Sequence, residues 1–194
     1  MKTYGWAGKI LRVDLTRKKI TIEPTMKYAI DFLGGKGVNA KILFDEVPPE
    51  VKPFDPENRI IFGTGPLTGT LAPSAARCNV TTKSPLTGIF GDANVGAYWG
   101  PELKFAGYDH IVIYGRSEKP VYLWINNDEV EIRDASHLWG KDTFETQEII
   151  KKELGDPEIQ IMCIGPAGEK KVRFANIVTG TSDSASRTGV GAVM

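Results

Sequence analysis

The amino-acid sequence predicts an α+β fold with two sheets that arise from an internal duplication. Segments with the alternating polarity of β-strands outnumber those with helical spacing. A Gly-Pro turn occurs twice, at Gly65-Pro66 and Gly165-Pro166, each time after a strand pair, a helix and a short apolar strand. We therefore expect one domain over residues 1–194, made of two related units at roughly residues 1–100 and 101–194. Coincidence is the alternative explanation, because Gly-Pro turns are common.

The first half begins with a predicted β-hairpin over residues 9–23, in which apolar and polar side chains alternate. Met26, Ile30 and Leu33 then follow at helical spacing, and this helix is expected to end at the glycine pair of residues 34 and 35. The other elements expected in this half are a helix over residues 38–45, a buried strand over residues 59–62 and a mixed strand over residues 77–82.

The second half contains a helix with a clear start signal. Asp142 has the spacing of a capping box with Glu145, and the helix is expected to end at Gly155. The strands expected around it lie at residues 109–114, 120–125, 129–132, 159–164 and 172–178, with a turn at residues 126–128.

Composition and charge exclude several classes of partner. Lys plus Arg equals Asp plus Glu at 24 each, which gives no electrostatic reason to expect nucleic acid or an anionic membrane as a partner. No apolar run approaches the roughly 18 residues of a membrane span. The first residues lack the layout of a signal peptide, so we expect a cytoplasmic location.

The chain's own metal-ligating side chains are few. Cys78 and Cys163 cannot hold a cluster or a structural zinc by themselves, since both need about four ligands, and we expect them to be buried. His110 lies in a strand-like run and His137 precedes an apolar Leu-Trp pair, so neither is expected to be part of a metal-ligand pair. Asp92 and Glu102 are expected to be solvated surface residues.

Two glycine-rich segments, residues 63–100 and 180–194, could hold a ligand. Small residues allow close approach to a flat or charged molecule, and free backbone amides can bind an anion. Each segment contains one arginine, Arg77 or Arg187, and a guanidinium pairs well with phosphate. Neither segment is a P-loop or a dinucleotide fingerprint. The alternative is that these glycines only turn the corners of two sheets.

A series of short strings resembles the aldehyde ferredoxin oxidoreductase family over essentially the whole chain. The strings are GPLTGT, TKSPLTG, ELKFAGYD, EKPVY, EIRDASHLWGK, IGPAGE, VRFA and GVGAVM. The resemblance implies the family's duplicated α+β N-terminal domain. It also implies tungsten (or molybdenum) held by two pyranopterin dithiolenes, whose phosphates share a Mg²⁺ ion.

The resemblance assigns six cofactor-binding residues: Arg77, Asn94, Gly96, Ser184, Ser186 and Arg187. The backbone carbonyls of Asn94 and Ser184 would ligate magnesium. Ser184 stands where the family usually has alanine, a change that a carbonyl ligand tolerates. Asp183 stands where the family has an arginine near the phosphates, which weakens the match on that side.

The resemblance also implies the reaction of the complete enzyme, the oxidation of aldehydes to carboxylates with ferredoxin as electron acceptor. The [4Fe-4S] cluster and the proton-transfer residues of the family lie in a C-terminal part beyond this sequence. We therefore expect the remaining domains or a partner subunit as partners, and self-association into a homo-oligomer. This chain alone should not turn over substrate.

Two alternatives stay open. The Ser-Ala-Ser-Arg run at residues 184–187, together with residues 47–50 and 125–128, is more similar to the tungsten subunit of class II benzoyl-CoA reductase. The other alternative is a non-catalytic pterin-binding or assembly scaffold.

Overall fold

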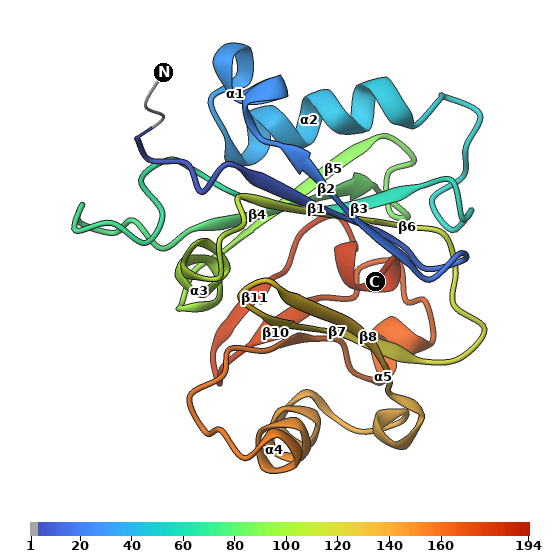
Figure 1. Cartoon of the computed structure of the whole chain (residues 1–194). Coiled ribbons are helices and arrows are strands. Elements are labelled where there is room, and N and C mark those ends of the chain that lie inside the picture. Colours follow the sequence, from blue (N-terminus) through green and yellow to red (C-terminus); the bar gives the residue numbers. More distant parts are fainter. Residues whose placement is uncertain (1–3) are drawn as a thin grey trace.

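A computed structural model describes residues 4–194 and has two layers of β-sheet with helices outside them (Figure 1). The first layer is a six-stranded sheet in the order β2-β1-β6-β3-β4-β5, in which only β1 and β6 pair in parallel. Its strands are β1 (Lys9–Asp14), β2 (Lys19–Pro24), β3 (Arg59–Thr64), β4 (Cys78–Lys83), β5 (Phe90–Val95) and β6 (His110–Tyr114).

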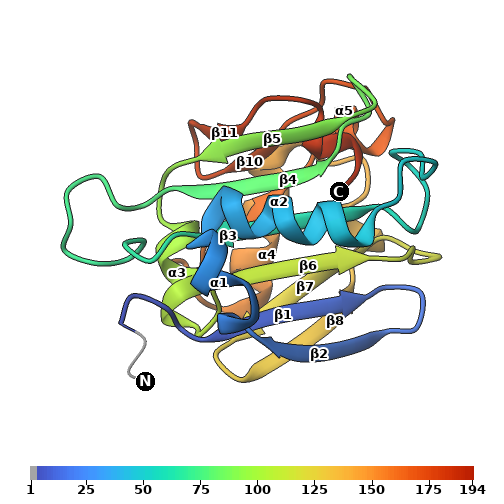
Figure 2. The same cartoon turned by 90° about the horizontal axis from the view of Figure 1, so that it is seen from above.

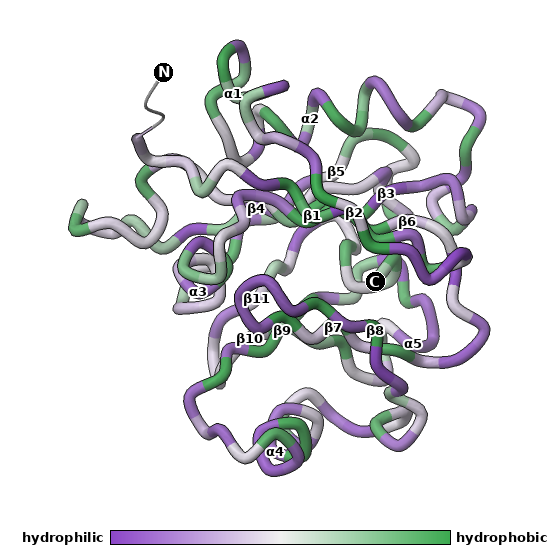
Figure 3. Tube along the Cα trace, viewed as in Figure 1, coloured by the Kyte–Doolittle hydropathy of each residue, from purple (hydrophilic) through white to green (hydrophobic). Residues whose placement is uncertain are grey.

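The second layer consists of a three-stranded sheet, β11-β10-β9, beside a two-stranded sheet, β7-β8. These strands are β7 (Val121–Asn126), β8 (Glu129–Asp134), β9 (Met162–Cys163), β10 (Ile177–Thr179) and β11 (Asp183–Ala185). The main hydrophobic core lies between the layers, where Leu11, Phe62 and Ile111 of the first layer pack with Ile177 and Ala185 of the second. Hydrophobic residues recur along the strands of both layers (Figure 3).

Helices cover the outer faces of both layers. Over the six-stranded sheet lie α1 (Met26–Phe32) and α2 (Gly35–Glu46), and α2 crosses above β3 and β4 (Figure 2). Under the second layer lies α4 (Thr143–Leu154) (Figure 1). The short elements are α3 (Trp99–Phe105), α5 (Pro166–Glu169) and the 3₁₀ turns Ser136–Leu138 and Val190–Ala192. No helix among residues 4–194 has the length and apolar character that a membrane span requires.

Several local predictions are confirmed, and with them the α+β class. The hairpin forms with Leu11 opposite Ile22. Asp142 accepts hydrogen bonds from the backbone of α4 while Glu145 accepts from the Asp142 amide, which completes the capping box. Gly155 ends that helix in the left-handed conformation. Both cysteines are buried.

Other local predictions were wrong in extent or orientation. In α1 the buried residues are Tyr28 and Ala29, whereas Ile30 and Leu33 are exposed. The strand expected over residues 159–164 is reduced to Met162–Cys163, and the one expected over 172–178 begins only at Ile177. Residues 90–95, expected to be a glycine-rich loop, form β5. Pairing with β4 makes this segment a strand, and its own composition gave no such signal.

Strand β6 lies between β1 and β3, although its residues were expected in the second unit's sheet. Its two faces explain the position: Val112 packs toward α2, and Ile111 packs into the core between the layers. A strand that is apolar on both faces belongs in the centre of a covered sheet. The sheets therefore do not divide at residue 100, and a two-fold relation between the halves stays a prediction.

Asp109, directly before β6, ties the N-terminal segment to the sheet. Its buried carboxylate accepts hydrogen bonds from the Ala7 and Gly8 amides, from the Thr25 hydroxyl and from Lys104 Nζ at 2.6 Å. Burial alone would raise the pKa of Asp109, but the hydrogen bonds from Lys104 and Thr25 outweigh burial and hold that pKa below its ordinary value. The carboxylate is thus a charged structural anchor.

Candidate functional site

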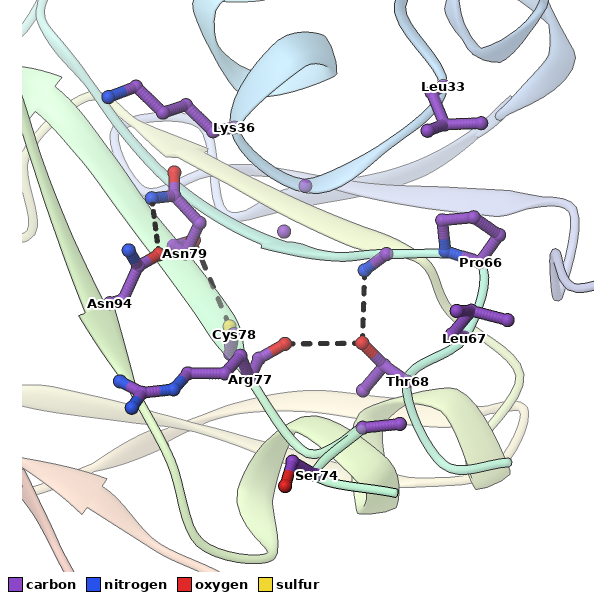
Figure 4. A pocket seen from close by; sticks show the side chains of 14 residues that line it. Leu33, Lys36, Pro66, Leu67, Thr68, Ser74, Arg77, Cys78, Asn79 and Asn94 are labelled. Carbon is purple, nitrogen blue, oxygen red and sulfur yellow. Dashed lines mark hydrogen bonds between the residues drawn. The ribbon is translucent and has the colours of Figure 1, made fainter. Parts of the chain in front are cut away.

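Two adjoining hollows lie along β4 and β5. The first, about 360 Å³, is lined by the start of α2 and by the loop between β3 and β4 (Figure 4). The second, about 530 Å³, lies between β5 and the C-terminal residues 186–188. Lys36, Arg77 and Asn94 line both hollows. We refer to the two hollows together as the groove.

The groove brings together four of the six residues expected to bind the cofactor: Arg77, Asn94, Ser186 and Arg187. Gly96 and Ser184 do not line it. They lie beside it, where the edge strand β5 contacts β11, the edge strand of the second layer. A Cβ atom on Gly96 would stand 3.1 Å from Asp183 Oδ1, so this glycine lets the two edges approach closely.

Arg77 is positioned through its backbone. The Gly65 amide donates to Thr68 Oγ1 at 3.1 Å, and the Thr68 hydroxyl donates to the Arg77 carbonyl at 3.2 Å (Figure 4). These bonds fix the end of the loop before β4. The Arg77 side chain is exposed and extends along the groove.

Arg187 is positioned by two residues in the left-handed conformation. Thr188 has φ +60° and Gly189 has φ +73°. A Cβ atom on Gly189 would lie 1.8 Å from the Arg173 carbonyl oxygen, so only glycine fits there. The Ser84 hydroxyl donates to the Thr188 carbonyl at 2.7 Å and holds the segment beside β5.

Lys36 is a groove residue that sequence reasoning missed. It lies in the first turn of α2, where Gly34 and Gly35 bring the helix close to Thr64; a Cβ atom on Gly34 would lie 3.2 Å from the Thr64 carbonyl oxygen. Lys36 Nζ pairs with Asp92 Oδ1 at 2.9 Å. The run of glycines around this lysine, at residues 34–37, was the available signal.

Asp92 was expected to be a solvated surface residue, and that expectation was wrong. Its side chain is only 23% exposed and lines the second hollow, held by Lys36 and by Asn79 Nδ2 at 3.2 Å. Asp183, which was expected to take the place of a family arginine, lines neither hollow. Glu102 is exposed, as expected.

The charges of the groove favour an anionic ligand. Three cationic side chains, Lys36, Arg77 and Arg187, line the second hollow with one carboxylate, Asp92. Ser186 and Asn94 add neutral polar groups. Arginine forks and a lysine ammonium together suit the oxygens of phosphate groups. This set of side chains is equipped to bind and orient an anion.

The two thiols take no part in such chemistry. Burial raises the pKa of Cys78 and of Cys163 to about 12 each, so both stay protonated at neutral pH. Within residues 4–194, no group of three or more His, Cys, Asp or Glu side chains is arranged to hold a metal ion.

Comparison with known proteins gives consistent results. Residues 10–194 match the family model described as aldehyde ferredoxin oxidoreductase, N-terminal domain. The chain is 53% identical over 192 residues to the tungsten-containing aldehyde ferredoxin oxidoreductase of Pyrococcus abyssi (strain GE5 / Orsay), covering 98% of this chain and 32% of that protein. Its identity to the protein of the same name from Pyrococcus horikoshii is 51%, with the same coverage.

A solved structure is as similar in sequence as the Pyrococcus abyssi protein. It is the active-site complex BamBC of benzoyl-coenzyme A reductase with 1,5-dienoyl-CoA, matched with a TM-score of 0.96 and 53% identity. The match covers 98% of this chain and 29% of that one. The chain thus spans about a third of the length of the curated relatives it matches.

Proposed function

The chain belongs to the aldehyde ferredoxin oxidoreductase family, as its N-terminal domain, and on this premise we propose that the groove binds the phosphates of a tungsten bis-pyranopterin cofactor. One observation carries the proposal. Arg77 from the first layer and Arg187 from the C-terminal segment line the same hollow, with Lys36 beside them. A ligand with two phosphate-bearing halves would find cations on both sides.

The residues present fit this group. The groove offers three cations and the hydroxyl of Ser186, and its glycines allow backbone and ligand to approach closely. For magnesium we propose the backbone carbonyls of Asn94 and Ser184, on the two edge strands that meet at Gly96. Carbonyl oxygens suit Mg²⁺, which otherwise keeps water and phosphate ligands.

The protein's part in this proposal is binding and orientation. When bound, the cofactor would supply the redox chemistry, oxidation of an aldehyde with water to a carboxylate with two electrons passed to ferredoxin. We propose that the [4Fe-4S] cluster and the proton-transfer groups belong to the part of the relatives' length that this chain does not cover. We also propose a cytoplasmic location and a homo-oligomer.

A second candidate, a domain of a benzoyl-CoA reductase-type tungsten subunit, rests on the solved structure, which is as similar in sequence as the aldehyde oxidoreductase. Assays of the complete protein separate the two. Aldehyde-dependent reduction of ferredoxin supports the first, and conversion of benzoyl-CoA or its dienoyl product supports the second. A protein that retains pterin but turns over neither substrate would be a scaffold.

Replacement of an arginine tests whether the groove binds the cofactor, which both candidate functions assume. In the complete protein, Arg77→Ala should lower cofactor affinity about ten- to a hundredfold, because a charge-assisted hydrogen bond contributes about 1.5–3 kcal/mol. Tungsten and pterin content after dialysis is the measurement. Arg17→Ala, an exposed arginine in the turn between β1 and β2, is the control that should keep its cofactor. Full tungsten content in Arg77→Ala would contradict the proposal.

A further inference from the structure

A line of buried polar side chains runs from the middle of the six-stranded sheet to the groove. His110 Nδ1 lies 2.8 Å from Asn39 Oδ1, and Asn39 Nδ2 lies 3.1 Å from Asn79 Oδ1. Asn79 Nδ2 then lies 2.9 Å from Asn94 Oδ1, at the groove (Figure 4). His110 and Asn39 have no exposed surface, and Asn79 is 4% exposed.

The other partners of Asn39 decide which atom donates in the contact between His110 and Asn39. Asn39 Nδ2 faces the carbonyl oxygens of Ile61 and Asn79, so this atom must be the amide nitrogen. Asn39 Oδ1 is then the acceptor, and His110 Nδ1 carries the proton that it receives. Burial lowers the pKa of His110 to about 4, so the ring has one proton at neutral pH, and Nε2 has no partner among the described residues.

The next two hydrogen bonds, from Asn39 to Asn79 and from Asn79 to Asn94, are donated in the same direction, toward the groove. Asn79 Oδ1 accepts from Asn39 and from the Thr81 hydroxyl, so Asn79 Nδ2 must donate. It donates to Asn94 Oδ1 and to Asp92 Oδ2, which both line the groove. Because Asn94 Oδ1 is already an acceptor for Asn79, the Asn94 side-chain NH₂ is left to face the groove.

Strand β3 makes room for this line through Gly63. A Cβ atom there would lie 2.3 Å from Asn39 Oδ1 and 2.5 Å from His110 Nδ1. Any other residue at this position would separate the imidazole from the amide. Apolar side chains would fill the same space without leaving a buried nitrogen unpartnered, so the line costs stability and calls for a role beyond packing.

We propose that His110, Asn39 and Asn79 are positioning residues of the groove. They hold the Asn94 amide as a hydrogen-bond donor toward phosphate oxygens, and they hold Asp92 as the partner of Lys36. Successive hydrogen bonds in one direction polarise each other, which strengthens the last donor. The inference rests on the proposed function, because it assumes that the groove receives phosphate.

The first test uses inorganic pyrophosphate as the probe and this chain as the protein. Asn79→Leu removes the donor to Asn94 and should weaken pyrophosphate binding about tenfold in calorimetry. Asn58→Leu is the matched control. Asn58 is equally buried, lies directly before β3 and donates to Pro53, Thr82 and Lys83, away from the groove, so its loss should lower stability but leave the affinity unchanged.

The second test follows the Asn94 side-chain amide by NMR. In the native chain its two protons should have distinct shifts that move on addition of pyrophosphate, and Asn79→Leu should abolish that movement. His110→Phe, which keeps a planar ring but loses the donor, should weaken binding, and His110→Gln, which offers an amide donor, should bind more tightly than His110→Phe.

Together, the variants show whether the positioning role fails alone or fails together with phosphate binding in the groove. Native affinity and native Asn94 shifts in Asn79→Leu would overturn the positioning role. If Arg77→Ala also leaves pyrophosphate binding unchanged, the proposed function fails together with it. Weakened binding in Arg77→Ala with native binding in Asn79→Leu would reject the positioning role alone.

Discussion

The imidazole of His110 gives the fold a predicted dependence on pH. Burial lowers its pKa from an ordinary 6.5 to about 4. Between these values the unfolded chain binds a proton that the native chain does not, so stability should rise with pH from about 4 to about 6.5. The full difference corresponds to about 3 kcal/mol at 1.36 kcal/mol per pH unit.

Urea unfolding at a series of pH values measures this slope. His110→Gln should flatten it, because glutamine does not titrate. A slope that is the same in native chain and His110→Gln would show that other groups cause it.

Some residues of the groove could be predicted from the sequence, and others could not. Arg77 and Arg187 were predicted as site residues because each is the arginine of a glycine-rich segment and each is similar in position to an arginine of the family. Lys36 was missed because the glycines around it, at residues 34–37, were interpreted only as the end of a helix. Asp92 was misjudged because its partners, Lys36 and Asn79, are distant in sequence and only the fold brings them together.

Among the elements, those with strong local signals were predictable. The alternation in residues 9–23 and the capping box of α4 are encoded within a few residues. β5 was not predictable, because its sequence lacks β-branched residues until Val95 and its strand form depends on β4. The central place of β6 likewise follows from tertiary burial of both its faces.

The segment after β11 is predicted to depend on one glycine. Gly189→Ala would place Cβ 1.8 Å from the Arg173 carbonyl oxygen at a φ of +73°, so the segment must move and carry Arg187 with it. We expect a loss of stability clearly above the roughly 1 kcal/mol of a positive φ alone, together with weaker pyrophosphate binding.

Gly180→Ala is the matched control for this segment. Its φ is +59°, but a Cβ atom there would meet nothing within 4 Å. It should cost about 1 kcal/mol and leave pyrophosphate binding unchanged. Equal binding by the two variants in calorimetry would mean that Arg187 does not depend on this turn.

For the whole molecule, net charge is a poor guide to its ligand. Acidic and basic residues balance at 24 each, and yet three cations and one carboxylate line the second hollow. The fold creates this difference, because α2, the residue before β4 and the C-terminal segment contribute cations to one surface. Local charge, and not the total, sets what the groove attracts.

Exposed apolar side chains next to the groove predict how this chain behaves in isolation. Leu33 and Leu67 flank the first hollow, and Leu71 is fully exposed in the loop between β3 and β4, which extends away from the body (Figures 3 and 4). Phe105 is also exposed and lies against this loop, since a Cβ atom on Gly69 would be 3.2 Å from its ring, and Tyr98 is exposed at the start of α3. Apolar patches beyond about 300–600 Å² are unusual on monomeric proteins.

We therefore expect the isolated chain to self-associate through this loop, because burial of apolar surface is favourable at about 25 cal/mol per Å². Sedimentation at increasing concentration should show dimers or larger species, and the double variant Leu67→Ser, Leu71→Ser should shift them to monomer. Phe44→Ser, on the outer helix α2, removes an equally exposed apolar residue at another surface and should have no effect. A native chain that stays monomeric at the highest concentration would refute self-association, and a monomeric Phe44→Ser variant would place the contact on α2 instead.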